Sequence, residues 1–148
     1  MILLLALLGL VAGALIPVQA AANAALSKSF SGGVVASGLT LFAVAAAVAL
    51  AAVAVTRTPL PSSHELRAAP AWSYVGGVIV AAYVLTITFL APRLGVGTAI
   101  AFIVTGQILA ALTIDHFGLM RSLHFPLTAG RALGGALMIV GAFLALRR

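Results

Sequence analysis

Charged residues are scarce in this sequence, and acidic residues are almost absent. Only 7% of the 148 residues are charged, with two carboxylates against eight lysines and arginines, whereas 64% are hydrophobic. The mean hydropathy is +1.26. A soluble domain carries charge on roughly a quarter of its residues. The low charge therefore excludes a soluble fold and predicts an integral membrane protein whose solvent is lipid.

Cysteine is missing altogether, which excludes disulfides and thiolate metal sites. His116 and His124 are eight residues apart with no third ligand nearby in the sequence, so we predict no metal site and no cofactor. The sequence also shows no Ser-His-carboxylate set, no Gly-rich phosphate loop and no nucleophile elbow. We therefore expect that the protein is not an enzyme.

The basic residues are scattered singly between apolar runs, although the net charge is +6. Nucleic-acid-binding proteins gather their positive charge in a patch or stripe. The scattered pattern predicts contact with anionic lipid headgroups, and no nucleic-acid partner.

Five apolar windows are long enough to span a bilayer, which takes about 20 residues. They run over residues 1–26, 33–55, 71–91, 94–114 and 127–146. Continuous apolar character without alternation indicates helices and not barrel strands. We predict a single all-α membrane domain over 1–148. Its longest loop is 56–70, a proline-containing hinge between a two-helix hairpin and a three-helix unit.

The first window resembles a signal peptide, because Ala20–Ala22 looks like a small-residue cleavage site. No lysine or arginine precedes it, however, so the basic region of a signal peptide is missing. We expect an uncleaved first span.

The basic residues are balanced between the two sides of a five-helix chain. The N-terminal side holds Arg57, Arg67, Arg121 and Arg131, and the opposite side holds Lys28, Arg93, Arg147 and Arg148. If Arg131 is counted as part of the fifth helix, the balance is three against four. The two sides then carry nearly equal positive charge, so the positive-inside rule favours neither orientation strongly. This balance predicts dual topology. Two opposed copies, or this chain and a homologous one, would make a ten-helix inverted pair.

Gln19 and Asn23 lie on one face of the first helix at about 100° per residue. They act either as hydrogen-bonding contacts between helices or as part of a substrate-binding cavity. Pro17 indicates either a kink or a broken helix that lines a site.

Two central polar residues of later helices, Tyr83 and Gln107, complete the predicted binding site near the bilayer midplane. Small residues and one proline are assigned to helix packing. These are Gly9, Gly13, Pro17, Gly76, Gly77, Gly130 and Gly134.

Asp115 lies directly after the fourth window and precedes Arg121 and Arg131. An ionisable group at a membrane boundary is a candidate for proton coupling, and an interfacial ion pair with an arginine is the structural alternative.

Several short motifs together resemble a known family. They are Pro17-Val-Gln19 with Asn23-Ala-Ala-Leu26, Trp72 with Gly76-Gly77, Tyr83 and Leu90-Ala-Pro92-Arg93-Leu-Gly95, then Gly106-Gln107, Ile114-Asp115-His116-Phe-Gly118, and Arg131-x-x-Gly134 with Gly141. The chain resembles the short five-helix YdcZ-like proteins of the bacterial drug/metabolite transporter superfamily. The resemblance implies a multi-pass inner-membrane protein that acts as an antiparallel homodimer or as half of a pair. It also implies similarity to EamA-like exporters and to small multidrug resistance proteins.

One departure from the small multidrug resistance proteins is informative. They carry a glutamate in the first helix, whereas here that helix has no acid. The leading hypothesis is an alternating-access transporter for a small polar or amphipathic metabolite or drug. A dual-topology ion channel and a non-transporting partner subunit of a membrane complex are the alternatives.

Overall fold

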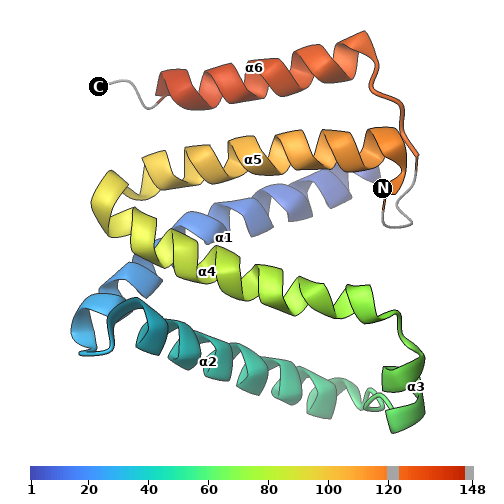
Figure 1. Ribbon diagram of the computed structural model, residues 1–148. Helices are drawn as coiled ribbons and strands as arrows, with labels where there is room; N and C mark the ends of the chain where they lie inside the picture. The colour runs from blue at the N-terminus through green and yellow to red at the C-terminus, as the bar shows by residue number, and fades with distance from the viewer. Residues whose placement is uncertain (120–123, 146–148) are drawn as a thin grey trace. The chain divides into compact units, whose positions relative to one another are not determined.

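The computed structural model is all-helical within the parts it describes, residues 1–119 and 124–145 (Figure 1). The chain divides into two compact units, one covering Met1–Arg93 and one beginning at Leu94. This division falls in the last turn of α4 (Val75–Leu94), whereas the sequence predicted a hinge in the connection 56–70.

The first unit begins with a helical hairpin. Helices α1 (Ile2–Ser29) and α2 (Gly33–Thr56) are joined by a short turn and pack against each other. The antiparallel hairpin predicted from the polar turn is therefore present. A second close approach lies in this unit, because Leu85 of α4 contacts α2 at the buried Gly38.

Helix α1 extends beyond the predicted end at residue 26. The hydroxyls of Ser27 and Ser29 donate to the carbonyls of Ala24 and Ala25, at 3.0 and 3.1 Å. These bonds satisfy the serine side chains inside the helix, so the helix continues to Ser29. It also runs without interruption through Pro17, so the structure does not show the broken helix that was one alternative.

The long connection contains a short helix that the sequence analysis missed. Helix α3 (Ser63–Ala68) starts with a capping box, in which Ser62 Oγ accepts from the Glu65 N–H and Glu65 accepts from the Ser62 N–H. A Ser followed three residues later by Glu is the sequence signature of this cap. The hydrogen bond from the Ser62 hydroxyl, followed by that from its N–H, lowers the pKa of Glu65. A single turn of 3-10 helix, η1 (Ala71–Tyr74), follows.

Helix α4 (Val75–Leu94) ends three residues later than predicted, because it continues through Pro92. A proline removes one helical hydrogen bond. Here Arg93 donates to the Phe89 carbonyl at 2.7 Å and lies over the Phe89 ring, with 3.6 Å between Cζ and the ring centroid. The chain turns at Gly95, whose φ of +84° favours glycine.

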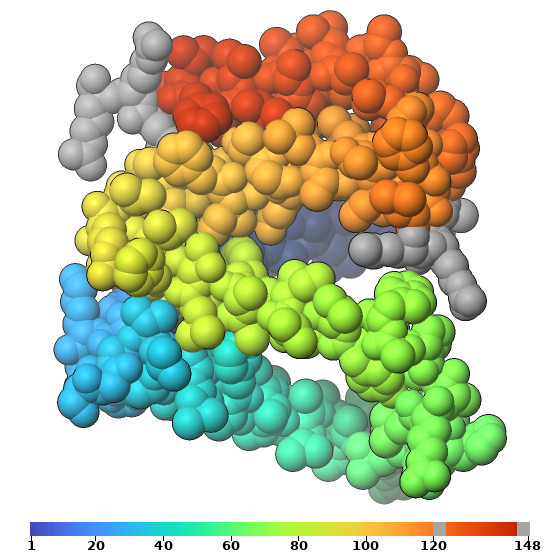
Figure 2. Space-filling view, viewed as in Figure 1, coloured from blue at the N-terminus to red at the C-terminus, as the bar shows by residue number. Residues whose placement is uncertain are grey.

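The second unit is a pair of helices, α5 (Val96–Phe117) and α6 (Ala129–Ala145), which lie side by side (Figures 1 and 2). Helix α5 ends at Gly118, which adopts a left-handed conformation with φ +58°. The closest approach is at the buried Gly135, where an added Cβ would lie 2.8 Å from Leu112 Cδ1. The small residue therefore allows the two helices to approach.

Among the described residues, four helices are long and apolar enough to cross a membrane. They comprise Ile2–Ser29, Gly33–Thr56, Ala71–Leu94 and Val96–Phe117. The fifth predicted span, 127–146, is a shorter helix of 17 residues within the described chain, or about 26 Å at 1.5 Å per residue. It begins late because Thr128 caps it, accepting from the Arg131 N–H at 3.3 Å. Residue 146 lies outside the described residues.

Hydroxyl side chains in the long helices bond back to their own backbone. The donors to a carbonyl three or four residues earlier are Ser27, Ser29, Ser37, Thr40, Thr56, Thr88, Thr105 and Thr113. In lipid, a hydroxyl without a partner costs free energy, and this local bond removes the cost.

The contact at Gly38 generates a test of the α2–α4 packing. A Cβ at Gly38 would lie 2.7 Å from Leu85 Cδ2. We expect Gly38→Leu to destabilise the protein by about 1–3 kcal/mol, since overpacking displaces neighbours. The control is Gly141→Leu, because a Cβ there meets nothing within 4 Å. Thermal unfolding in detergent should show a lower Tm for Gly38→Leu only, and equal Tm values would contradict this packing.

Candidate functional site

A partly open groove of about 460 Å³ lies between α1 and α2. It is lined by Gln19, Ala22, Asn23 and Leu26 of α1 and by Thr40, Leu41, Val44 and Ala45 of α2. All of these side chains are uncharged. The lining of the groove is thus mostly apolar and includes two side-chain amides and one hydroxyl.

The helical period explains which residues of α1 face the groove. Gln19, Ala22, Asn23 and Leu26 are spaced i, i+3, i+4 and i+7, which is one face of an α-helix. The small Ala22 leaves space between the two amides. The structure therefore brings Gln19 and Asn23 to one groove, on the shared face that their spacing predicts.

Asn23 is the distinctive polar residue of the groove. Its side chain is almost completely buried, with 4% of the residue exposed. Its Nδ2 finds no hydrogen-bond partner among the residues that the structure describes. Leaving a buried polar group unpaired costs about 1–3 kcal/mol. The amide therefore carries an unused hydrogen-bonding capacity at the wall of the groove.

Thr40 is a groove residue that the sequence analysis did not select. Its hydroxyl donates to the Ala36 carbonyl at 3.0 Å, which leaves oxygen lone pairs available as acceptors. Ser37, one turn earlier, is buried and bonds to the Val34 carbonyl. Two hydroxyls one turn apart in an otherwise apolar helix were the signal that could have identified this face.

The groove lies off the centre of α1, toward the turn between α1 and α2. Gln19 and Asn23 precede Ser29, the last residue of α1, by ten and six residues. At 1.5 Å per residue they lie about 15 and 9 Å from that end, whereas the middle of the helix is about 21 Å from it. The groove is thus displaced from the middle of α1 toward the α1–α2 turn, and its depth in the bilayer stays a prediction.

The other two predicted binding residues do not line this groove. Tyr83 is half-buried on α4, in the first unit. Gln107 is exposed on α5, in the second unit. The structure therefore places two of the four predicted residues together, and the roles of Tyr83 and Gln107 stay predictions.

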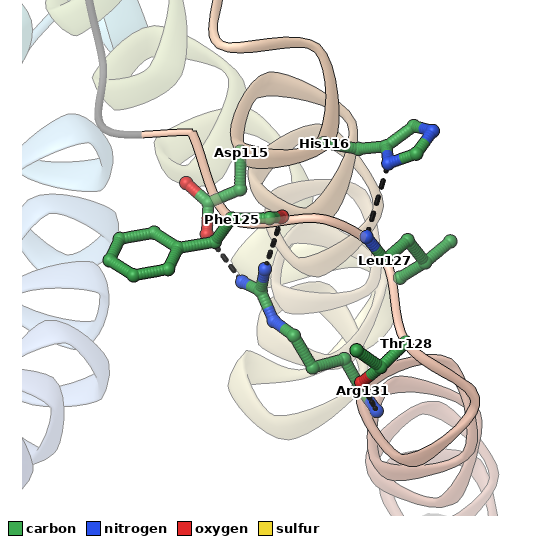
Figure 3. Close-up of polar contacts among 6 residues, drawn as sticks. All are labelled: Asp115, His116, Phe125, Leu127, Thr128 and Arg131. Atoms are coloured by element: carbon green, nitrogen blue, oxygen red, sulfur yellow. Dashed lines mark hydrogen bonds and ion pairs between the residues drawn. The ribbon is translucent and has the colours of Figure 1, made fainter.

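A second polar cluster ties the end of α5 to the start of α6 (Figure 3). Arg131 donates through one guanidinium nitrogen to Asp115 Oδ2 at 2.5 Å, and through the other to the Phe125 carbonyl at 2.6 Å. The side chains of Arg131 and Asp115 are 34% and 33% exposed. Of the two interpretations of Asp115, the structure shows the ion pair. Proton coupling through this carboxyl group stays a prediction.

Backbone contacts complete this cluster. The Phe125 N–H donates to the Asp115 carbonyl at 2.9 Å. The Leu127 N–H donates to His116 Nδ1 at 3.1 Å (Figure 3). As an acceptor, Nδ1 must be unprotonated, so a neutral His116 carries its proton on Nε2. Within the described ranges, no three His, Asp or Glu side chains gather closely enough to hold a metal ion.

All six glycines assigned to helix packing border open space in this chain. A Cβ would meet nothing within 4 Å at Gly9, Gly13, Gly76, Gly77, Gly130 or Gly134. The close approaches are instead at Gly38 and Gly135. Close helix contacts at the six predicted glycines therefore stay predictions that need a second chain.

The comparison with known proteins bears on the whole of this architecture. A family described as "Putative inner membrane exporter, YdcZ" matches residues 4–144, from the first turn of α1 to the last turn of α6. The chain belongs to this family. No curated protein and no solved structure matches it.

Membership of the YdcZ family confirms the resemblance found in the sequence motifs. The protein is a multi-pass α-helical protein of the inner membrane and a member of an exporter family. The match covers both units, so the groove in α1–α2 and the ion pair in α5–α6 both lie within the region that defines the family.

The ion pair of this YdcZ-family protein can be tested by a double-mutant cycle. We expect Asp115→Asn and Arg131→Gln to couple by about 0.2–1 kcal/mol in unfolding free energy, because the pair is partly exposed. Arg131→Gln alone should cost more than Asp115→Asn, since it also removes the bond to the Phe125 carbonyl.

Thermal unfolding in detergent measures this coupling. The matched control pairs Asp115→Asn with Arg93→Gln, because Arg93 binds the backbone of its own helix. That pair should be additive. A coupling energy of zero between Asp115 and Arg131 would show that the ion pair does not stabilise the α5–α6 connection.

Proposed function

We propose that this protein exports a small, uncharged polar or amphipathic molecule by alternating access. It would work as an inverted homodimer, or paired with a homologous chain, and leave its substrate chemically unchanged. The groove between α1 and α2 would bind the substrate. The observation that carries the proposal is the buried Asn23 amide at this groove, whose Nδ2 has no partner within the described chain.

The chemistry of the groove supports this class of substrate. An amide can donate and accept hydrogen bonds, and Gln19 offers a second amide one turn away. A substrate with a carbonyl, hydroxyl or amide group would satisfy Asn23. The hydrocarbon walls formed by Leu26, Leu41 and Val44 would hold its apolar part.

The same groove is poorly suited to a lipophilic cation. The lining residues include no carboxylate, and an unpaired charge in an apolar environment is costly. The two acids of the chain are engaged elsewhere, Glu65 in the cap of α3 and Asp115 with Arg131. This supports a neutral substrate over drug–proton exchange at a carboxylate of the first helix.

The displacement of the groove fits an inverted pair. In each copy the groove lies toward its own α1–α2 turn, so an axis in the membrane plane would direct the two grooves toward opposite faces of the bilayer. A substrate could then pass from one groove to the other. The open space beside Gly9 and Gly13 would accept a helix of the second copy.

Substitution of the groove amides tests the site. We expect Asn23→Ala and Gln19→Ala each to lower transport about 2- to 10-fold, the effect of losing one hydrogen bond of about 0.5–1.5 kcal/mol. A panel of small neutral compounds is first ranked by the rise in Tm of the purified protein. Flux of the best compound is then measured in proteoliposomes.

Two further variants make this result specific. Thr113→Val should transport normally, because the Thr113 hydroxyl is exposed and bonds to the Leu109 carbonyl of its own helix. Gln107→Ala tests whether the predicted residue of α5 contributes. Unchanged flux in Gln19→Ala and Asn23→Ala, with normal flux in Thr113→Val, would remove the groove as the substrate site.

The inverted arrangement can be tested through topology. We expect reporters fused to the C-terminus to give signals on both sides of the inner membrane, since the basic residues provide little directional preference. Added lysines on one loop should bias the signal to one side. A signal from one side alone in the unmodified protein would reject dual insertion.

A further inference from the structure

Two arginines in the connection between α2 and α4 differ from the other arginines that the structure describes. Arg93 binds the Phe89 carbonyl and ring, and Arg131 binds Asp115. The side chains of Arg57 and Arg67 are exposed and make no hydrogen bond or ion pair with any described residue. Their guanidinium groups are therefore available to a partner outside the chain.

Glu65 lies between Arg57 and Arg67 in the sequence, but it forms no ion pair with either arginine within the described chain. Glu65 Oε2 accepts hydrogen bonds from the N–H and the hydroxyl of Ser62, at 2.8 and 2.7 Å. This capping box holds the carboxylate at the start of α3, whereas Arg67 lies in its last turn. The connection thus keeps unpaired positive groups beside an acid that is bound locally.

Large apolar side chains accompany the arginines. Leu66, Trp72 and Tyr74 are 48%, 49% and 51% exposed. The Tyr74 hydroxyl donates to the Leu66 carbonyl at 2.7 Å, which ties α3 to the start of the span that continues as α4. In Figure 1, α3 lies at the end of α2 and beside the start of α4.

This combination is suited to a bilayer surface. The connection begins where the span α2 ends, at Arg57, and finishes at the beginning of the next span. Trp and Tyr rings favour the headgroup level of a membrane, and guanidinium groups bind phosphate in a bidentate manner. Each arginine near an anionic surface therefore adds attraction for anionic lipid.

We infer that this connection is a binding site for the phosphate headgroup of an anionic lipid. Arg57 and Arg67 supply the positive charge that attracts the phosphate, while Leu66, Trp72 and Tyr74 contact the upper part of the acyl chains. The partner is a lipid of the surrounding bilayer and is distinct from the exported molecule. The lipid site does not depend on the groove between α1 and α2.

The sequence provides an internal probe for this site. Trp72 is the only tryptophan of the chain, so its fluorescence reports lipid at this surface alone. The protein is reconstituted in vesicles that contain phosphatidylcholine and phosphatidylglycerol, with bromine on the acyl chains of one lipid at a time. Quenching by each brominated lipid gives the relative affinity of the surface for the two headgroups.

We expect stronger quenching by brominated phosphatidylglycerol than by brominated phosphatidylcholine. Arg57→Gln or Arg67→Gln should reduce the preference by up to about fivefold each, and the double variant should remove it. Higher salt should weaken the preference of the unmodified protein, because exposed charges are screened. Arg57→Lys and Arg67→Lys keep the charge and should keep most of the preference.

Arg93→Gln is the matched control, since Arg93 is about 30 Å from Trp72 along the helix and is bound to Phe89. It should leave the preference unchanged. Equal quenching by the two lipids in the unmodified protein would overturn the inference. So would a preference that survives in the double Gln variant, or one that falls equally in Arg93→Gln.

Discussion

A polar side chain inside a membrane must find its hydrogen bonds within protein, because lipid offers none, and the helices of this protein depend on that constraint. The hydroxyls of Ser37, Thr40 and Thr88 satisfy it by donating to carbonyls of their own helix. These bonds need no neighbouring helix. They allow serine and threonine to lie in long apolar helices without forcing a particular tertiary arrangement.

An asparagine or glutamine amide carries more hydrogen-bonding groups than one local bond can satisfy. This difference separates Asn23 from the hydroxyl residues around it. Asn23 is buried, yet its Nδ2 is without a partner in the described chain, and it borders a groove whose walls are mostly hydrocarbon. The buried amide thus lacks the local hydrogen bond by which the hydroxyls are satisfied.

The two helix pairs are held together in different ways. The α1–α2 hairpin is joined by a short turn and leaves a groove between its helices. The α5–α6 pair approaches closely at Gly135, and its connection is fixed by the ion pair of Asp115 with Arg131. The only acid of the spanning helices, Asp115, is used in this tie, and the residues that line the groove are themselves uncharged.

From length and apolar composition, which are local properties, the sequence predicts the lipid solvent, the helical class and five membrane spans, of which four are long enough to cross a membrane within the described residues. It also placed Gln19 and Asn23 on one face, because helical geometry fixes relative angles within a helix. It did not predict α3, although Ser62 and Glu65 carry the capping signature. It also predicted several helix ends at the wrong residues, because α1 continues to Ser29, α4 continues through Pro92, and the chain turns at Gly95. The packed helices were needed to show that Thr40 shares the groove, that Asp115 pairs with Arg131, and that Gly38 and Gly135 are the close contacts. These facts depend on which faces of two helices meet, and a single apolar helix with a nearly uniform surface does not encode which of its faces finds a neighbour.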